Sequence, residues 1–151
     1  MLTEVGKRIE GESLLKVCSE NSVPVFCPGI TDGAFGMQLA FFAQKHSDFK
    51  INIVRDFSKI MDAGLTANKT LGIILGGGIA KHHTIISNII NGLDYAIYIN
   101  SSSPYHGSLS GATTSEAKSW GKIKEGAKSV TIYGDAGIVF PMLVATMENF
   151  S

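Results

Sequence analysis

The sequence predicts an α/β fold in which a parallel sheet carries helices on both faces. Short apolar runs of strand length alternate along the chain with longer apolar stretches of helical spacing, as in repeated strand–helix–strand units. The 17 glycines gather after the apolar runs and so predict tight turns at the strand ends. Because ligands of such folds bind at the carboxyl ends of the strands, function is sought first in those turns.

The first predicted unit lies near the start of the chain. The apolar run Val23–Phe26 indicates a short buried strand, and a helix with apolar residues at Phe35, Leu39 and Phe42 follows it. Residues 49–54 fit either another strand or the entry to a helix around Ile60, and the sequence leaves both open.

Later elements are clearer. Strands are expected at 71–75, 94–100 and 130–133, with helices from 79 to about 91, through 116–120, and from 138 to about 149. The last helix is apolar on most of its surface, so we expect it to be buried or paired with another chain.

Composition limits the class of protein. The chain of 151 residues has the length of one domain, and 13 basic residues balance 13 acidic ones without a basic run, which argues against nucleic acid or a membrane as partner. Its two cysteines form no disulfide framework, and no zinc-ligand spacing is present, so no metal is expected. The N-terminus lacks a signal-peptide core and no apolar run has membrane-spanning length, which predicts a cytoplasmic protein.

The stretch Ser115–Lys124 carries the strongest chemical signal. Glu116 and Trp120 are four residues apart and project from one face of a helix. If the helix ends at Gly121, Lys122 leaves beside the indole, where partial desolvation would lower its pKa and favour imine chemistry. Ordinary structural roles compete with this interpretation: Glu116 fits a capping box with Thr113, the indole could be core, and the lysine could be a solvated charge at a helix end.

The glycine turns suggest a nucleotide. Gly76, Gly77 and Gly78 lie between a strand and a helix, where backbone amides can meet a pyrophosphate, although a turn that only packs helix on strand has the same pattern. Asp32 and Asp135 follow other predicted strands and could bind ribose hydroxyls or cap helices. His82 or His83 could move a proton, or form a surface pair. The loop 101–111 is long and polar, which is typical of functional loops and also of mobile ones.

Taken in order, these segments resemble deoxyhypusine synthase. The matching pieces are Val23–Phe26, Thr31–Gly33, Leu75–His83, Asp94–Asn100, Ser110–Ala112, Glu116-Ala117, Ser119–Ile123 and Val139–Pro141. The resemblance implies a Rossmann-like NAD-binding fold, and NAD-dependent transfer of the aminobutyl group of spermidine to a lysine of the translation initiation factor 5A precursor. It also implies active sites at the subunit interfaces of an oligomer.

The resemblance also implies residue roles. Lys122 would form the imine and His82 would assist in amine recognition or proton transfer, as the catalytic pair. The positions that it assigns to the polyamine are Glu116, Trp120, Gly107, Ser108 and Ser110. Those that it assigns to NAD are Asp32, Gly76, Gly77, Gly78, Ser101, Ser102, Gly134 and Asp135.

The chain departs from the family in two ways. Met37, Leu109 and His106 stand where eukaryotic members carry acidic residues, an archaeal-like pattern that predicts altered amine specificity. The chain, residues 1–151, corresponds only to the C-terminal, lysine-bearing portion of the family, so the fold is expected to be incomplete. The chain could be an excised fragment, a subunit of a split enzyme or a short paralogue, and activity is expected to need a second chain. A non-catalytic regulatory paralogue, and an aminobutyl transferase acting on a small amine, remain alternatives.

Overall fold

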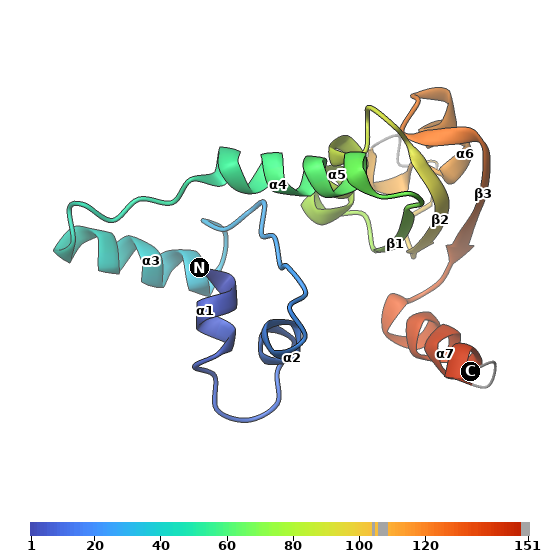
Figure 1. The fold of residues 1–151 in the computed structure, drawn as a ribbon. Coiled ribbons are helices and arrows are strands. Elements are labelled where there is room, and N and C mark those ends of the chain that lie inside the picture. Colours follow the sequence, from blue (N-terminus) through green and yellow to red (C-terminus); the bar gives the residue numbers. More distant parts are fainter. Residues whose placement is uncertain (104, 106–108, 149–151) are drawn as a thin grey trace. The chain divides into compact units, whose positions relative to one another are not determined.

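The computed structural model describes residues 1–103, 105 and 109–148 (Figure 1). The chain divides into two compact units, Met1–Phe57 and Ser58–Ser151.

The first unit is helical. It contains α1 (Leu2–Gly6), α2 (Leu14–Glu20), α3 (Ala34–Lys45) and the start of α4 (Ile53–Thr66). The Ser13 hydroxyl caps α2 by accepting a 3.1 Å hydrogen bond from the Lys16 amide. Helices α1 and α2 touch at Gly6, where a Cβ atom would lie 2.3 Å from the Leu15 carbonyl oxygen. Only a glycine therefore fits at this crossing.

The strand predicted at Val23–Phe26 is wrong. These residues lie in a segment without regular structure, because the described part of the first unit contains no strand with which they could pair. Pro24 would also leave any ladder without one amide donor. Of the two alternatives for residues 49–54, the second is confirmed, since the segment leads directly into α4. The helix expected around Phe35, Leu39 and Phe42 is confirmed as α3.

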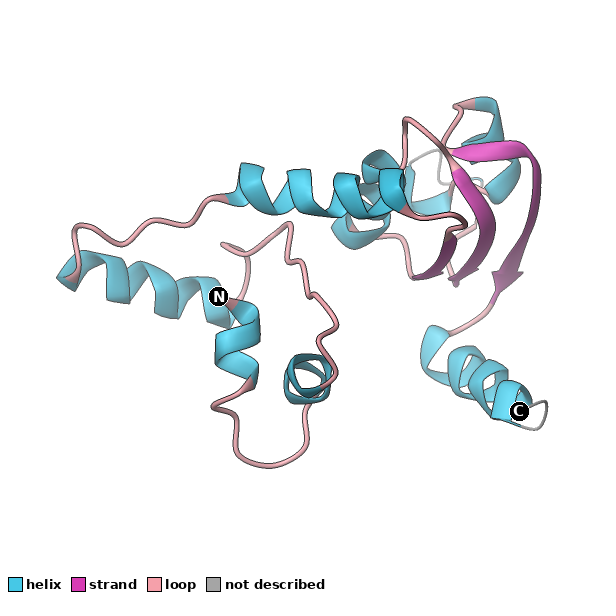
Figure 2. Cartoon of the chain, in the orientation of Figure 1, coloured by secondary structure: helices cyan, strands magenta, loops and turns pink. Residues whose placement is uncertain are grey.

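The second unit contains the predicted parallel sheet. Strands β1 (Leu71–Leu75), β2 (Leu93–Asn100) and β3 (Ile123–Tyr133) follow this order in space, and both pairs are parallel. The three arrows in Figure 2 accordingly point the same way. The first two strands match the prediction, whereas β3 begins seven residues earlier than Val130, the expected start. The α/β class with a Rossmann-like sheet is therefore confirmed.

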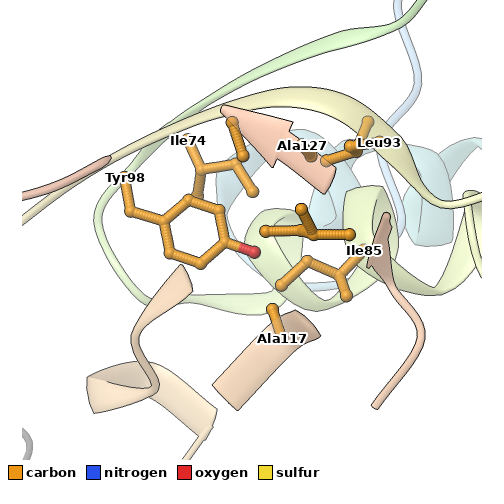
Figure 3. Packing of buried hydrophobic residues seen from close by; sticks show 8 residues of the cluster. Ile74, Ile85, Leu93, Tyr98, Ala117 and Ala127 are labelled. Carbon is orange, nitrogen blue, oxygen red and sulfur yellow. The ribbon is translucent and has the colours of Figure 1, made fainter. Parts of the chain in front are cut away.

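Two helices cover one face of this sheet. Side chains of α5 (Ile79–Ser87) and α6 (Thr114–Ser119) meet the strands in a buried cluster (Figure 3) made of Ile74, Ile85, Leu93, Ala96, Tyr98, Ala117, Ile123 and Ala127. Ile85 of α5 and Ala117 of α6 meet the paired residues Ile74 and Tyr98, so both helices lie on the same side. Helix α5 ends before the predicted Asn91, because Asn88 caps it.

The other face of the sheet is apolar and largely exposed. Alternate residues of β1, namely Leu71, Ile73 and Leu75, are at least 36% exposed. A shallow hollow of about 360 Å³ crosses this face, lined by Leu71, Tyr95, Ala96, Ile97, Lys128, Ser129 and Val130. Helix α7 (Ala136–Glu148) is similarly exposed, with Ile138 and Met142 both at 65%. These surfaces have the composition of an interface rather than of a solvated exterior.

Candidate active site

A tight turn ends α6 and positions Lys122. Gly121 has φ +69°, its amide donates to the Lys118 carbonyl, and the Lys122 amide donates to the Ala117 carbonyl at 3.0 Å. These two bonds form a Schellman motif, which requires the left-handed conformation that glycine adopts readily. The Lys122 carbonyl in turn accepts a 3.1 Å hydrogen bond from the Leu93 amide of β2. The backbone of Lys122 is thus fixed from both sides.

The Lys122 side chain lies beside the indole. Its Nζ is 5.1 Å from the centre of the Trp120 ring, within cation–π range, and Trp120 is the C-cap of α6. This is the helix end that the sequence predicts. The indole is 46% exposed and is not part of the core.

Glu116 has a structural role in α6. One of its carboxylate oxygens, Oε2, accepts a 2.7 Å hydrogen bond from the Thr113 amide, and the Thr113 hydroxyl accepts one from the Glu116 amide. The capping box is therefore present. The side chain is exposed, and both bonds that it accepts within the described residues use Oε2. The other carboxylate oxygen, Oε1, accepts neither of these hydrogen bonds.

The three glycines of the β1–α5 turn differ in whether, and why, the backbone needs a glycine at that position. Gly76 has φ +79° and donates its amide to the Ile99 carbonyl. Gly77 lies against the backbone of Ser110, where a Cβ atom would come within 2.6 Å of the Ser110 oxygen. At Gly78, the N-cap of α5, a Cβ atom would meet nothing within 4 Å. The space beside Gly78 and the first amides of α5 fit an anionic group such as a pyrophosphate.

Asn100, the last residue of β2, organises the loop that follows. It is 8% exposed, its amide nitrogen donates to the Ser110 carbonyl, and its Oδ1 accepts from the Ser102 amide at 3.1 Å. Ser101 and Ser102 thus begin at the carboxyl end of β2, and Ser110 returns to it in a short 3-10 turn. Gly107 and Ser108, like His106, lie outside the described residues.

The predicted aspartates have different settings. Asp135 begins α7, where its Oδ1 accepts from the Gly137 amide at 2.8 Å and its carbonyl accepts from Val139. The capping interpretation therefore holds for Asp135, and Gly134 before it donates to the Asn100 carbonyl. Asp32 belongs to the first unit, and there Gly33, not Asp32, is the N-cap of α3.

The two histidines face different environments. His82 is exposed on α5, whereas His83 is half-buried, and burial together with the neighbouring His82 lowers the pKa of His83. Of the two, His82 is the more accessible to a ligand. No group of three or more His, Cys, Asp or Glu side chains that could hold a metal occurs within the described ranges. Nor does any helix there have the length and apolarity to cross a bilayer.

Two polar residues of this region were not predicted from the sequence. Asn100 is one, and Lys81, at 3% exposure, is the other. Both side chains donate to the Ser110 carbonyl. Their position directly after the glycine turn and at a strand end was the available signal, but burial cannot be read from position alone.

The described candidate residues of the second unit lie at two opposite ends of the sheet. The glycine turn, Ser101, Ser110 and Asp135 follow the carboxyl ends of the strands, whereas Lys122 precedes β3 at the amino end, where Leu93 pairs with Ile123. The eight residues of β2 separate these ends by about 23 Å at about 3.3 Å per residue. One chain therefore does not bring Lys122 to its own glycine turn.

Comparison with known proteins identifies the family. The family model described as deoxyhypusine synthase matches residues 1–147. Probable deoxyhypusine synthases of Thermoplasma volcanium and Sulfolobus acidocaldarius are 48% and 47% identical over 96% and 97% of this chain, but over only 47% and 48% of their own lengths. Deoxyhypusine synthase of Candida glabrata is 46% identical over 96% of this chain and 39% of its own length. The chain thus spans about half the length of the curated relatives it matches, or less, and it belongs to the deoxyhypusine synthase family.

Proposed function

We propose that this chain is the lysine-bearing portion of a deoxyhypusine synthase. It would transfer the aminobutyl group of spermidine to one lysine of the translation initiation factor 5A precursor, with NAD as cofactor. The observation that carries the proposal is the turn at Gly121, which fixes the backbone of Lys122 and leaves its amine beside an exposed indole, in a chain of this family.

The chemistry at Lys122 is a pair of amine exchanges. NAD, when bound, supplies hydride acceptance from the polyamine at the start and hydride return at the end. The neutral Lys122 amine adds to the oxidised carbon of spermidine, the bond from that carbon to its original nitrogen breaks, and the remaining diamine leaves with a proton. The substrate lysine then adds to the same carbon and releases Lys122 as a free amine. Reduction of the new imine completes the product.

Trp120 and Glu116 suit a polycation. An indole face attracts an ammonium group by about 0.5–2 kcal/mol, depending on how dry the site is. Glu116, one α-helical turn away, offers its second carboxylate oxygen to another amine of the same molecule. His82 stays the proposed residue for amine recognition or proton transfer, because it is exposed.

The carboxyl end of the sheet would hold NAD. The room beside Gly78 and the first amides of α5 fit the pyrophosphate, and Ser101 and Ser102 stand next to them. Gly134 and Asp135 complete this end of the sheet. For Asp32, of the first unit, a contact with NAD is proposed from the resemblance alone.

The separation of the two ends favours a shared site. A hydride moves only between touching atoms, and about 23 Å is far beyond the reach of a lysine side chain. We therefore propose that Lys122 of one chain works with the glycine turn of another chain in a homo-oligomer, or in a complex with a chain that supplies more of the family's length. The exposed faces of α7 and of the sheet offer apolar area for such contacts.

A mixing experiment tests the shared site. Lys122→Arg removes the nucleophile, and Gly78→Asp places a carboxylate where the pyrophosphate would bind, in space that a side chain does not otherwise fill. Neither variant assembly should transfer the aminobutyl group. An equal mixture, dissociated and reassembled, should recover about a quarter of the sites, as in a statistical two-chain exchange. No recovery, with mixed assembly verified, would refute the shared site.

Borohydride trapping tests the nucleophile. With NAD and labelled spermidine, the active assembly should retain label on Lys122, and Lys122→Arg should retain none. Label that persists in the variant would exclude Lys122.

A regulatory role is the second candidate, and the exposed apolar faces favour it, since they fit binding to a full-length paralogue as well as to a copy. Stimulation of such a paralogue that does not change with Lys122→Ala would support it over catalysis.

A further inference from the structure

Lys81, in the first turn of α5, is the most deeply buried lysine of the described part of the second unit. It is 3% exposed. Its Nζ donates to the Ala112 carbonyl at 2.8 Å and to the Ser110 carbonyl at 3.2 Å, and lies 4.9 Å from the centre of the Tyr98 ring. Buried lysines usually pair with a carboxylate, yet no hydrogen bond or ion pair joins Lys81 to one within the described residues. Burial lowers the pKa of Lys81, and the charge of Glu116 partly opposes this.

This geometry does not suit a nucleophile. Two of the three ammonium hydrogens are directed to carbonyl oxygens, and the ring of Tyr98 covers the amine on another side. Lys122, in contrast, is half-buried, beside an exposed ring. The role of Lys81 must therefore come from the two backbone carbonyls to which it donates.

Lys81 holds the segment that closes over the glycine turn. The Ser110 oxygen receives a second donor, the side-chain amide of Asn100, and the Ser110 backbone lies against Gly77 with no room for a Cβ atom between them. Ala112 stands immediately before Thr113, the N-cap of α6. One ammonium group therefore ties the start of α5, the end of the long loop and the start of α6 together.

We infer that Lys81 is a positioning residue for the cofactor turn: by holding the carbonyls of Ser110 and Ala112, it keeps the backbone of Gly77 and Gly78 in the conformation that receives the pyrophosphate of a dinucleotide. The inference rests on the proposed function, because it takes NAD as the ligand. A lysine that only filled space could be replaced by methionine, whose volume is similar, without moving the turn.

The test compares two lysines that both donate to carbonyls. Lys118 is partly buried at the end of α6, and its Nζ donates to the Ala127 carbonyl at 2.8 Å, away from the glycine turn. In the active assembly, NAD binding measured by calorimetry should weaken about tenfold or more for Lys81→Met, as expected for loss of a charged hydrogen bond. Lys118→Met should leave the dissociation constant of NAD within about twofold of the parent. Equal weakening by both variants would overturn the inference.

Two further readouts separate positioning from catalysis and from misfolding. At saturating NAD, borohydride should still trap label on Lys122 in Lys81→Met, and loss of trapping there would overturn the positioning role. If Lys81→Met does not fold, Asn100→Ala removes the other donor to Ser110 and should weaken NAD binding in the same way. Unchanged binding in a folded Asn100→Ala protein would count against the inference.

The same measurements distinguish this inference from the proposed function. A parent assembly that does not bind NAD refutes both. A parent that binds NAD, with Lys81→Met and Lys118→Met indistinguishable from it, refutes only the role of Lys81.

Discussion

Replacing Tyr98 with phenylalanine should stabilise the second unit. Tyr98 is 1% exposed, and its hydroxyl has no hydrogen-bond partner within the described residues, although it points into the buried cluster (Figure 3). An unsatisfied buried hydroxyl costs about 1–3 kcal/mol of desolvation. Phenylalanine keeps the ring that Lys81 faces and removes only the oxygen. We expect a gain of about 1 kcal/mol in the free energy of unfolding, or roughly 4–8 °C in the midpoint for a unit of this size.

The pH dependence of unfolding gives a second, independent signature. Burial raises the pKa of Tyr98 to about 12, above the ordinary value of 10.0. The folded state therefore keeps its proton while the unfolded state loses it, so this contribution to stability is complete below pH 10 and disappears as the pH rises towards 12. The loss is on the order of 2–3 kcal/mol. Tyr98→Phe should not show it.

Chemical denaturation at several pH values, with Tyr95→Phe as control, measures both effects. Tyr95 lies on the same strand but is 37% exposed, so removal of its hydroxyl should change the stability little. A Tyr98→Phe protein that is less stable than the parent by 1 kcal/mol or more, roughly the value of one hydrogen bond, would show that the hydroxyl has a partner and would refute the reasoning.

Two other changes test local features. Gly121→Ala forces a side chain into the left-handed region, so it should cost about 1–2 kcal/mol of stability and reduce trapping at Lys122. Gly126→Ala, at a position with open space and no positive φ, should have neither effect. Equal thermal unfolding of the two variants would contradict this expectation. The pKa of Asp94 is lowered, first by its hydrogen bond from Lys124 and then by Thr70, so its contribution to stability is present above its ordinary pKa of 3.8 and disappears as the pH falls through the lower, folded value. Asp94→Asn should therefore flatten the acid limb of the unfolding profile, and an unchanged limb would show that the pair contributes nothing.

The sequence predicted the second unit better than the first. The run at 71–75 became a strand because a neighbouring apolar strand, β2, pairs with it, whereas the similar run Val23–Phe26 has no strand partner within its own described unit. An apolar run indicates only that its residues tend to be buried, and it forms a strand where another strand is available to pair with it. The early start of β3 was missed because its residues 124–126 are polar or glycine and give no apolar signal.

For the site, features that depend on residues close in sequence could be predicted, whereas those that depend on tertiary contacts could not. Gly121 indicated the helix end, and the T-x-x-E pattern indicated the capping box, since both depend on residues within one turn. The burial of Lys81 and the role of Asn100 depend on a carbonyl that arrives from a loop 29 or 10 residues away. The placement of Lys122 at the amino end of the sheet was not predicted, because β3 was expected to begin only at Val130.

The fixed backbone of Lys122 also limits how far its side-chain amine can move. Because the amide and carbonyl of this residue are both bonded, to α6 and to β2, the turn acts as a pivot and only the four side-chain torsions can swing the amine. That arm sweeps a radius of about 6 Å. Under the proposed function, the donor polyamine and the acceptor lysine would therefore occupy this small volume one after the other. The departing diamine would have to leave before the protein substrate could enter. Order of arrival would then be set by the geometry of one helix end rather than by a moving domain.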